Sequence, residues 1–439
     1  MYKYIEIANA LETLFKEMNF KPGQRVPSVR DLCKTYNCHQ STAVKALNYL
    51  KEQNIVYSIP QSGYYITGRL DSNDETPEEF DFKSASPDSR FFPYMEYQKC
   101  VNLAIEKNKS DLFEYGNLNG YVPLKVSISK LLTKDYIFTQ IDNIVITSGI
   151  QQCLSILTEL DFNNERKKVL VEQPTYHCYI DYLKLNGFDV ELIDRTFEGL
   201  DLVKLEEFFK KGEIKFFYTL ARVHNPLGTK LSQREKKKII ELAYRYNVYI
   251  VEDDYMADYI TDKTNDPLFT YDLKGTHAIY LRSFSKSIFP GLRVGFAVLP
   301  KTLVDTFSEK KYYQDMGTSL LSQASLDVYL RNKMYNRHMY KMIKLYKNRA
   351  ELLRSILTDL NVQGSFRSQS DASIIHTCLD VKKYVSLKKL NQSGIKIADI
   401  RKHYYTWNKD HYTYLPLNVS NVSNDRIDTG IRKLLKRIE

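Results

Sequence analysis

The 439-residue sequence lacks the features of secreted and membrane-spanning chains. No apolar run approaches the roughly 18 residues that a membrane-spanning helix needs. The first fifteen residues form an amphipathic pattern with scattered charges instead of a signal-peptide pattern. The six cysteines lie far apart without a Cys-x-x-Cys pair, which favours reduced thiols over disulfides. We therefore expect a cytoplasmic protein, and the sequence predicts no metal site.

Glycine and proline are scarce, with 17 and 13 residues, and the sequence contains no internal repeat or low-complexity tract. A hydrophobic fraction of 43% is enough for a large core, which excludes extensive disorder. At roughly 150 residues per domain, the length predicts two or three folding units. The net charge of +10 permits a polyanionic partner, but a solvated basic surface would explain it equally well.

Changes in charge and periodicity divide the chain into three parts. Residues 1–68 are basic overall, and residues 69–85 turn acidic and polar with little periodicity, as expected of a linker. In residues 86–439, short apolar runs alternate with amphipathic segments. This alternation predicts a mostly parallel sheet flanked by helices, with its large part at about 120–300 and a smaller part mainly at 331–439.

The first 68 residues predict three helices and a β-hairpin. One helix covers about residues 3–18, and a second starts after Ser28, where Asp31 completes a capping-box-like pattern. A third helix follows a short turn, and two β-rich runs then flank another turn, as in a wing. In a helix-turn-helix, the first turn of the second helix meets base edges in the major groove.

Polar side chains of this unit are candidates for DNA contacts. Base-edge candidates at the start of the third helix are Gln40, Ser41, Thr42 and Lys45. Phosphate candidates in the second helix and the wing are Arg30, Gln61, Ser62 and Gly63. The alternative is a small helical domain whose charges are merely solvated.

The motifs of this segment resemble the GntR-type winged helix. They are Pro22-Gly23, Val26-Pro27-Ser28-Val29-Arg30, Thr42-Ala43-Val44-Lys45-Ala46-Leu47 and a glycine in the wing. The resemblance implies a DNA-binding domain. Gln40 stands where an arginine is common and Gln61 where the wing usually has its first glycine, so the resemblance does not define the operator preference.

The segment YLRSFSKSIFPGLRVGFAVLP, residues 280–300, contains a lysine between Ser-x-Ser and Pro-Gly-Leu-Arg. The amine of Lys286 can form an imine with an aldehyde cofactor in a dry pocket. Side chains suited to a phosphate group are Ser283, Ser285 and Arg293. Gly291 and Gly295 allow close backbone approach. A lysine on its own would more often lie on the surface, so this interpretation depends on its partners.

Four other fragments, each following an apolar run, supply such partners. Asp253 can keep the ring nitrogen of pyridoxal 5'-phosphate protonated. Tyr255 and Asn225 can bind the phenolic oxygen of the ring, and Tyr176 can stack on it. A further turn opens a helix, so its backbone amides suit a phosphate. The residues of that turn are Gly149, Ile150 and Gln151.

Together these motifs resemble fold-type I pyridoxal-phosphate enzymes, specifically the aminotransferase-like domain of MocR-type regulators, over nearly the whole chain. The resemblance implies a winged helix-turn-helix followed by a mostly parallel sheet flanked by helices and a smaller α+β subdomain. It also implies that Lys286 carries the cofactor as an internal aldimine and that Tyr115 reaches the cofactor of the partner subunit. The family's dimers often place each DNA-binding head on the other subunit, which implies a domain-swapped homodimer on double-stranded operator DNA.

The last thirty residues depart from the aminotransferase pattern. Such domains usually place an arginine before an apolar strand, where it binds the substrate carboxylate. Here Pro416 occupies that position. Arg401 is a candidate replacement if its loop folds inward, and otherwise a solvated residue. We therefore expect transamination of α-amino acids to be weak or absent.

The resulting hypothesis is a regulator whose DNA binding is switched by a ligand with different affinities for two domain arrangements. The ligand is either pyridoxal phosphate itself, as in regulation of vitamin B6 synthesis, or an amino compound that forms an external aldimine, as in regulation of amino acid metabolism. The departure at Pro416 slightly favours the first. The rival hypothesis is an active pyridoxal-phosphate-dependent aminotransferase with a helical head. A regulator that has lost its cofactor is disfavoured, because every cofactor-contacting position is retained.

Overall fold

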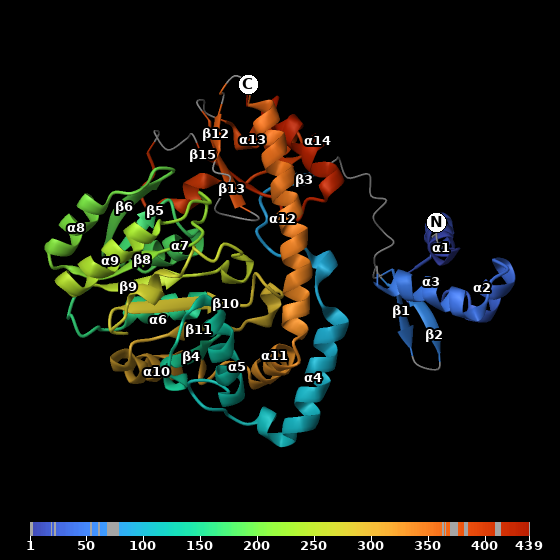
Figure 1. The fold of residues 1–439 in the computed structure, drawn as a ribbon, viewed down its shortest axis with the longest axis horizontal. Coiled ribbons are helices and arrows are strands. Elements are labelled where there is room, and N and C mark those ends of the chain that lie inside the picture. Colours follow the sequence, from blue (N-terminus) through green and yellow to red (C-terminus); the bar gives the residue numbers. More distant parts are fainter. Residues whose placement is uncertain are drawn as a thin grey trace. The chain divides into compact units, whose positions relative to one another are not determined.

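The computed structural model comprises two compact units that divide between Glu79 and Phe80 (Figure 1). It describes residues 3–438 except 19, 22, 53–54, 60–61, 68–78, 362–363, 365, 369–375, 382–384 and 409–413. In the described part of the chain, no helix is both long enough and apolar enough to cross a membrane. Nor do the described His, Cys, Asp and Glu residues form a group able to hold a metal ion.

The first unit has the three helices and the hairpin that the sequence predicts. Its elements are α1 (Lys3–Glu17), α2 (Val29–Thr35), α3 (Gln40–Glu52), β1 (Val56–Ile59) and β2 (Gly63–Ile66). The capping box at α2 is confirmed, because Ser28 Oγ accepts from the Asp31 amide at 3.2 Å and the Asp31 carboxylate accepts from the Ser28 amide at 3.2 Å. Apolar side chains at helical spacing on α1 and α3, including Leu11 and Leu47, form the buried core.

The second unit is built on an eight-stranded sheet with the order β4-β11-β10-β9-β8-β5-β6-β7. The strands are β4 (Ile144–Thr147), β5 (Lys168–Gln173), β6 (Val190–Thr196), β7 (Gly199–Leu200), β8 (Ile214–Thr219), β9 (Tyr249–Asp253), β10 (Ala278–Ser283) and β11 (Gly295–Val298). The five central strands from β10 to β6 are parallel, and the others pair antiparallel. The predicted mostly parallel sheet is therefore confirmed.

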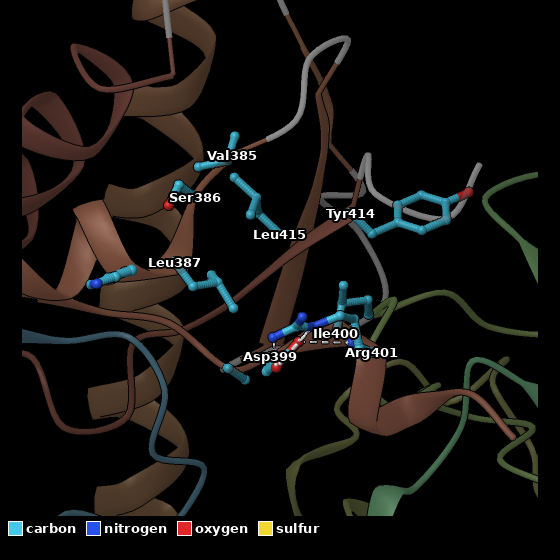
Figure 2. A pocket seen from close by; sticks show the side chains of 10 residues that line it. Val385, Ser386, Leu387, Asp399, Ile400, Arg401, Tyr414 and Leu415 are labelled. Atoms are coloured by element: carbon cyan, nitrogen blue, oxygen red, sulfur yellow. Dashed lines mark hydrogen bonds and ion pairs between the residues drawn. The ribbon is translucent and has the colours of Figure 1, made fainter. Parts of the chain in front are cut away.

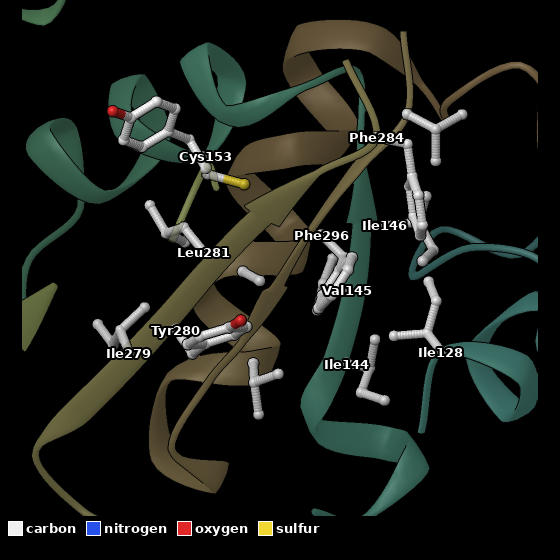
Figure 3. Close-up of a cluster of buried hydrophobic side chains, with 14 of the residues drawn as sticks. Ile128, Ile144, Val145, Ile146, Cys153, Ile279, Tyr280, Leu281, Phe284 and Phe296 are labelled. Carbon is white, nitrogen blue, oxygen red and sulfur yellow. The ribbon is translucent and has the colours of Figure 1, made fainter. Parts of the chain in front are cut away.

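Helices flank this sheet and bury its apolar side chains. They are α4 (Tyr94–Asn108), α5 (Val122–Leu132), α6 (Ile150–Glu159), α7 (His177–Leu185), α8 (Leu202–Lys210), α9 (Gln233–Tyr246), α10 (Lys301–Asp315) and α11 (Leu320–Arg331). Figure 3 shows part of the main core, where Ile146, Leu281 and Phe296 from three strands lie among side chains of the surrounding helices. Because these strands are fully buried, they are rigid supports for the loops at their ends.

The smaller part follows the long helix α12 (Met334–Leu360). Its sheet is antiparallel in the order β12-β13-β15, formed by Phe366–Ser368, His376–Val381 and Tyr414–Asn418. The other elements are α13 (Leu387–Gln392), β14 (Ile395–Lys396), the 3-10 helix η8 (Ile400–His403) and α14 (Asn424–Leu435).

The end of the predicted linker is folded into this smaller part. Strand β3 (Phe80–Asp81) pairs in parallel with β14, and Phe80 and Phe82 are buried in the local core. The prediction of a linker over residues 69–85 is therefore wrong for its last residues, because Phe80 and Phe82 supply apolar side chains to a core although the segment around them is acidic and polar. Residues 69–78 lie outside the described part of the structure.

Candidate functional site

Lys286 lies in the turn after β10, next to the carboxyl ends of the parallel strands. Its Nζ donates a hydrogen bond of 2.6 Å to the carbonyl oxygen of Ala85. Burial lowers the pKa of Lys286 to about 8, although Cys178 and Asp253 nearby act in the opposite direction. The amine is therefore neutral in a larger fraction of molecules than a solvated lysine would be, as a nucleophilic lysine requires.

Asp253 ends β9 and has one engaged and one free carboxylate oxygen. Tyr218 from β8 donates a hydrogen bond of 2.9 Å to Oδ2, whereas the buried Oδ1 has no hydrogen-bond partner among the described residues. Burial raises the pKa of Asp253 to about 7. A buried acceptor without a donor is costly, so this site is suited to a ligand that brings an N–H group.

Tyr255, two residues further along, presents a second buried polar atom. Its hydroxyl group has no hydrogen-bond partner in the described structure, and its ring lies 5.8 Å from the His376 ring, edge to face. Asn225 is half-buried in the loop after β8. The residues beside Lys286 thus offer an acceptor at Asp253 and a hydroxyl at Tyr255, the two groups that the ring nitrogen and phenolic oxygen of pyridoxal phosphate require.

The predicted phosphate side is formed by two backbone segments in close contact. Gly149 (φ 99°) precedes α6, and Arg293 (φ 54°) donates from Nη2 to the Ser148 carbonyl oxygen at 2.8 Å. A Cβ atom on Gly149 would lie 3.0 Å from Arg293 Nη2, and one on Gly295 would lie 3.0 Å from the Cα atom of Gly149. The predicted close approach is confirmed at Gly295. It is wrong at Gly291, where a Cβ atom would have only an ordinary contact of 3.9 Å.

The other predicted phosphate residues lie on the same two segments. Ile150 and Gln151 begin α6, and Ser283 ends β10, where it pairs with Gly295 of β11. Ser285 is half-buried one residue before the lysine. The amino end of α6 thus lies against the β10–β11 strand pair, whose strand β10 leads into the turn of Lys286.

Three histidines that were not among the predicted site residues, His177, His376 and His403, lie next to predicted site residues or to one another. The His177 ring lies 5.7 Å from the Tyr176 ring and 5.2 Å from the His403 ring. Burial lowers the pKa of both His376 and His403 to about 3, so both rings are neutral at physiological pH. The sequence could have indicated His177, because it follows Tyr176 directly. His376 in β13 and His403 in η8 are far from the other site residues in the sequence, so no local pattern marks them.

Neither of the two positions considered for a substrate carboxylate carries an unpaired arginine. Pro416 lies buried in β15 opposite Cys378 of β13. Arg401 forms hydrogen bonds of 2.6–3.1 Å to both carboxylate oxygens of Asp399. Figure 2 shows this pair beside a cavity of about 150 Å³ whose lining contains none of the predicted cofactor residues.

The predicted partner-facing residue and four of the described DNA-facing residues are exposed. Tyr115 is 84% exposed in the single chain. In the first unit, Arg30, Gln40, Ser41 and Lys45 are exposed, whereas Thr42, Ser62 and Gly63 are half-buried. Gln61 lies outside the described residues.

Comparisons with known proteins agree with this architecture. The family model described as aminotransferase class I and II matches residues 89–405, and that of the gntR family of bacterial regulatory proteins matches residues 3–66. The HTH-type transcriptional regulator YcxD of Bacillus subtilis is 40% identical over the full length of both chains. NorG of Staphylococcus aureus (strain USA300), an HTH-type transcriptional regulator, is 25% identical over 76% of this chain and 82% of its own.

Solved aminotransferases share the fold of the second unit. The kynurenine aminotransferase of Pyrococcus horikoshii, solved with PMP, has a TM-score of 0.75 and 25% identity over 83% of this chain and 91% of its own. The α-aminoadipate aminotransferase LysN of Thermus thermophilus, complexed with N-(5'-phosphopyridoxyl)-L-leucine, has a TM-score of 0.72 and 22% identity over 81% and 91%.

The fold and the matches define a DNA-binding head of the GntR type followed by an aminotransferase class I and II domain. The chain belongs to the MocR-type transcriptional regulators.

Proposed function

We propose that this regulator binds pyridoxal 5'-phosphate at Lys286 and that the bound ligand changes its affinity for operator DNA. The observation that carries the proposal is the pair of buried, unpartnered polar atoms beside the lysine, Asp253 Oδ1 and Tyr255 Oη. Asp253 Oδ1 can accept a hydrogen bond from the ring N–H group of this cofactor, and Tyr255 Oη can donate one to its phenolic oxygen. The fold neighbours that contain PMP or a phosphopyridoxyl group support the same cofactor class.

When bound, the cofactor supplies an aldehyde and an electron-withdrawing ring. Lys286 binds it covalently, and Asp253 holds a proton on the ring nitrogen. Tyr255 and Asn225 bind the ring oxygen, and Tyr176 packs on the ring. The phosphate residues are Gly149, Ile150, Gln151, Ser283, Ser285 and Arg293.

The surroundings of the site favour an effector without a carboxylate. Pro416 cannot form a charge-assisted pair, and Arg401 is engaged with Asp399. The histidines His376 and His403 are neutral because burial lowers their pKa. Pyridoxal phosphate itself is therefore the favoured signal, and an amine that lacks a carboxylate is the second candidate.

An active aminotransferase is the alternative function, and the solved neighbours give it support. The two functions differ in amino acid recognition. In a site that uses an arginine for the carboxylate, an amino acid binds far better than the corresponding simple amine. We expect spectral titrations of the cofactor-loaded protein with alanine and with ethylamine to give similar affinities and no steady-state transamination. A strong preference for alanine with turnover would establish the enzyme.

The proposal includes a homodimer with sites completed by the partner subunit. Phe113, Tyr115 and Val122 are apolar and at least half exposed in the single chain, at 75%, 84% and 51%. Exposed aromatic side chains in one segment are typical of an interface. We infer that Tyr115 reaches the partner's cofactor and that the heads, exchanged between subunits, bind the two halves of an operator.

The direct test is an absorbance titration of the purified protein with pyridoxal phosphate. We expect a visible band that borohydride reduction fixes to Lys286, identified by peptide mass, and no band with Lys286→Ala. Tyr97→Phe is a matched control, since it also removes one buried, unpartnered tyrosine hydroxyl, from a ring that packs on Phe289 and Tyr329 and is not among the proposed cofactor contacts. Absence of the band in the wild-type protein would overturn the cofactor assignment.

A further inference from the structure

The segment Ser84–Asp88 is held on two opposite sides. On one side, Ser420 Oγ donates to the carbonyl oxygens of Ser84 and Ser86 at 3.0 and 2.9 Å. On the other side, the carbonyl oxygen of Ala85 accepts from Lys286 at 2.6 Å. Ser420 lies between β15 and α14 of the small part, so neighbouring carbonyl groups of the segment bind different parts of the unit. The proposed cofactor lysine is thus the contact that holds the middle of the segment to the large part of the second unit.

The far end of the segment is fixed to α12. Buried Arg349 donates to Asp88 Oδ2 at 3.1 Å and also to the carbonyl oxygen of Ser420. The Asp88 amide donates to the Tyr346 hydroxyl at 2.9 Å. The segment therefore has a firm anchor at Asp88 and a separate attachment at Ala85 that depends on a reactive amine.

Ala85 lies between β3, which pairs with β14 in the small part, and α4 of the large part. The segment that Lys286 holds is thus a chain connection between the two parts of the second unit. We propose that the hydrogen bond from Lys286 to Ala85 transmits the ligand state of the lysine to this connection. The inference rests on the proposed function, in which Lys286 binds an aldehyde.

The chemistry of attachment removes the donor. Attachment joins Nζ to the aldehyde carbon, and the aldehyde oxygen leaves as water together with both hydrogens of the neutral amine. The carbonyl oxygen of Ala85 then loses the short hydrogen bond of 2.6 Å that Nζ donates in the ligand-free protein. Ligand binding therefore loosens the segment at Ala85 while Ser420 and Arg349 still hold its neighbours.

Hydrogen–deuterium exchange of the full-length protein, with pyridoxal phosphate as the probe, tests this coupling. In the wild-type protein we expect exchange in peptides spanning residues 82–90 to rise at least about threefold at saturation. Peptides of α9 are an internal control and stay unchanged. The Lys286→Met variant keeps a side chain of similar length but cannot donate a hydrogen bond. We expect its peptides spanning residues 82–90 to exchange rapidly with or without the probe.

Lys286→Arg is the matched variant, because it keeps a donor but cannot attach an aldehyde. We expect slow exchange in the same peptides under both conditions. Unchanged exchange in a wild-type protein that shows the visible band would overturn the coupling alone. Slow exchange in a Lys286→Met variant with wild-type circular dichroism would also overturn it. Absence of the band would instead mark the failure of the proposed cofactor role.

Discussion

The hydroxyl group of Tyr218 donates a 2.9 Å hydrogen bond to Oδ2 of Asp253, while Oδ1 of the same carboxylate is buried without a partner. The two side chains come from adjacent parallel strands, β8 and β9. The contact orients the carboxylate and stabilises its ionised form, which burial disfavours. Tyr218 is therefore a positioning residue for the proposed ring-binding carboxylate.

Removal of this hydrogen bond is expected to weaken the binding of pyridoxal phosphate. Hydrogen bonds to charged groups contribute about 1.5–3 kcal/mol, so Tyr218→Phe should raise the dissociation constant about tenfold or more. The absorbance titration measures it, and Tyr97→Phe should bind as the wild type does. Equal affinities for the Tyr218→Phe and wild-type proteins would show that the contact does not support ligand binding.

Asp253→Asn is expected to stabilise the ligand-free protein at pH 8 and to weaken cofactor binding. The pKa of Asp253 in the folded protein, about 7, exceeds its ordinary value of 3.8. The wild-type protein therefore loses stability as the pH rises from about 4 to about 7, whereas asparagine does not titrate. The gain at pH 8 should be on the order of 1–4 kcal/mol.

Denaturant unfolding of the ligand-free proteins at pH 4.5 and pH 8 measures this gain. We expect it to be small at the lower pH, where the wild-type carboxyl group is protonated. A gain that is equal at both pH values would contradict the assigned pKa.

The rate at which the visible band forms should rise with pH and level off above about 8. Burial lowers the pKa of Lys286 to about 8, and only the neutral amine attacks an aldehyde. Stopped-flow absorbance at saturating ligand measures the profile. A midpoint near 10.5, the ordinary lysine value, would mean that the amine is solvated before attachment.

The two groups of predicted DNA contacts should respond differently to substitution. Arg30→Ala should weaken binding to all sequences alike. It should also reduce the slope of log affinity against log salt concentration by about one, as expected for the loss of one phosphate contact. Gln40→Ala should instead change the preference among operator variants by about 1–3 kcal/mol at one base pair. Fluorescence anisotropy with operator variants at several salt concentrations separates the two effects. Equal losses on every sequence for Gln40→Ala would place it at the backbone.

Local patterns in the sequence predicted the elements that position the site, because buried strands and capped helices are specified by nearby residues. The capping box at Ser28 and the strand ends at Asp253 and Ser283 are examples. Strand β6 has no continuous apolar run to mark it in the sequence, because it carries charged residues on a half-buried surface next to the short edge strand β7. Contacts over long sequence separations, such as Lys286 with Ala85 and Tyr255 with His376, leave no local pattern.

The central claim is that ligand binding at Lys286 changes the affinity for DNA. Its most direct test is the dissociation constant for a cognate operator, measured at fixed salt with and without saturating pyridoxal phosphate. We expect the ligand to change this constant at least about fivefold in the wild-type protein, the lower end of typical couplings between sites. In Lys286→Ala it should have no effect. Equal constants with and without ligand, in a wild-type protein that shows the visible band, would contradict the account.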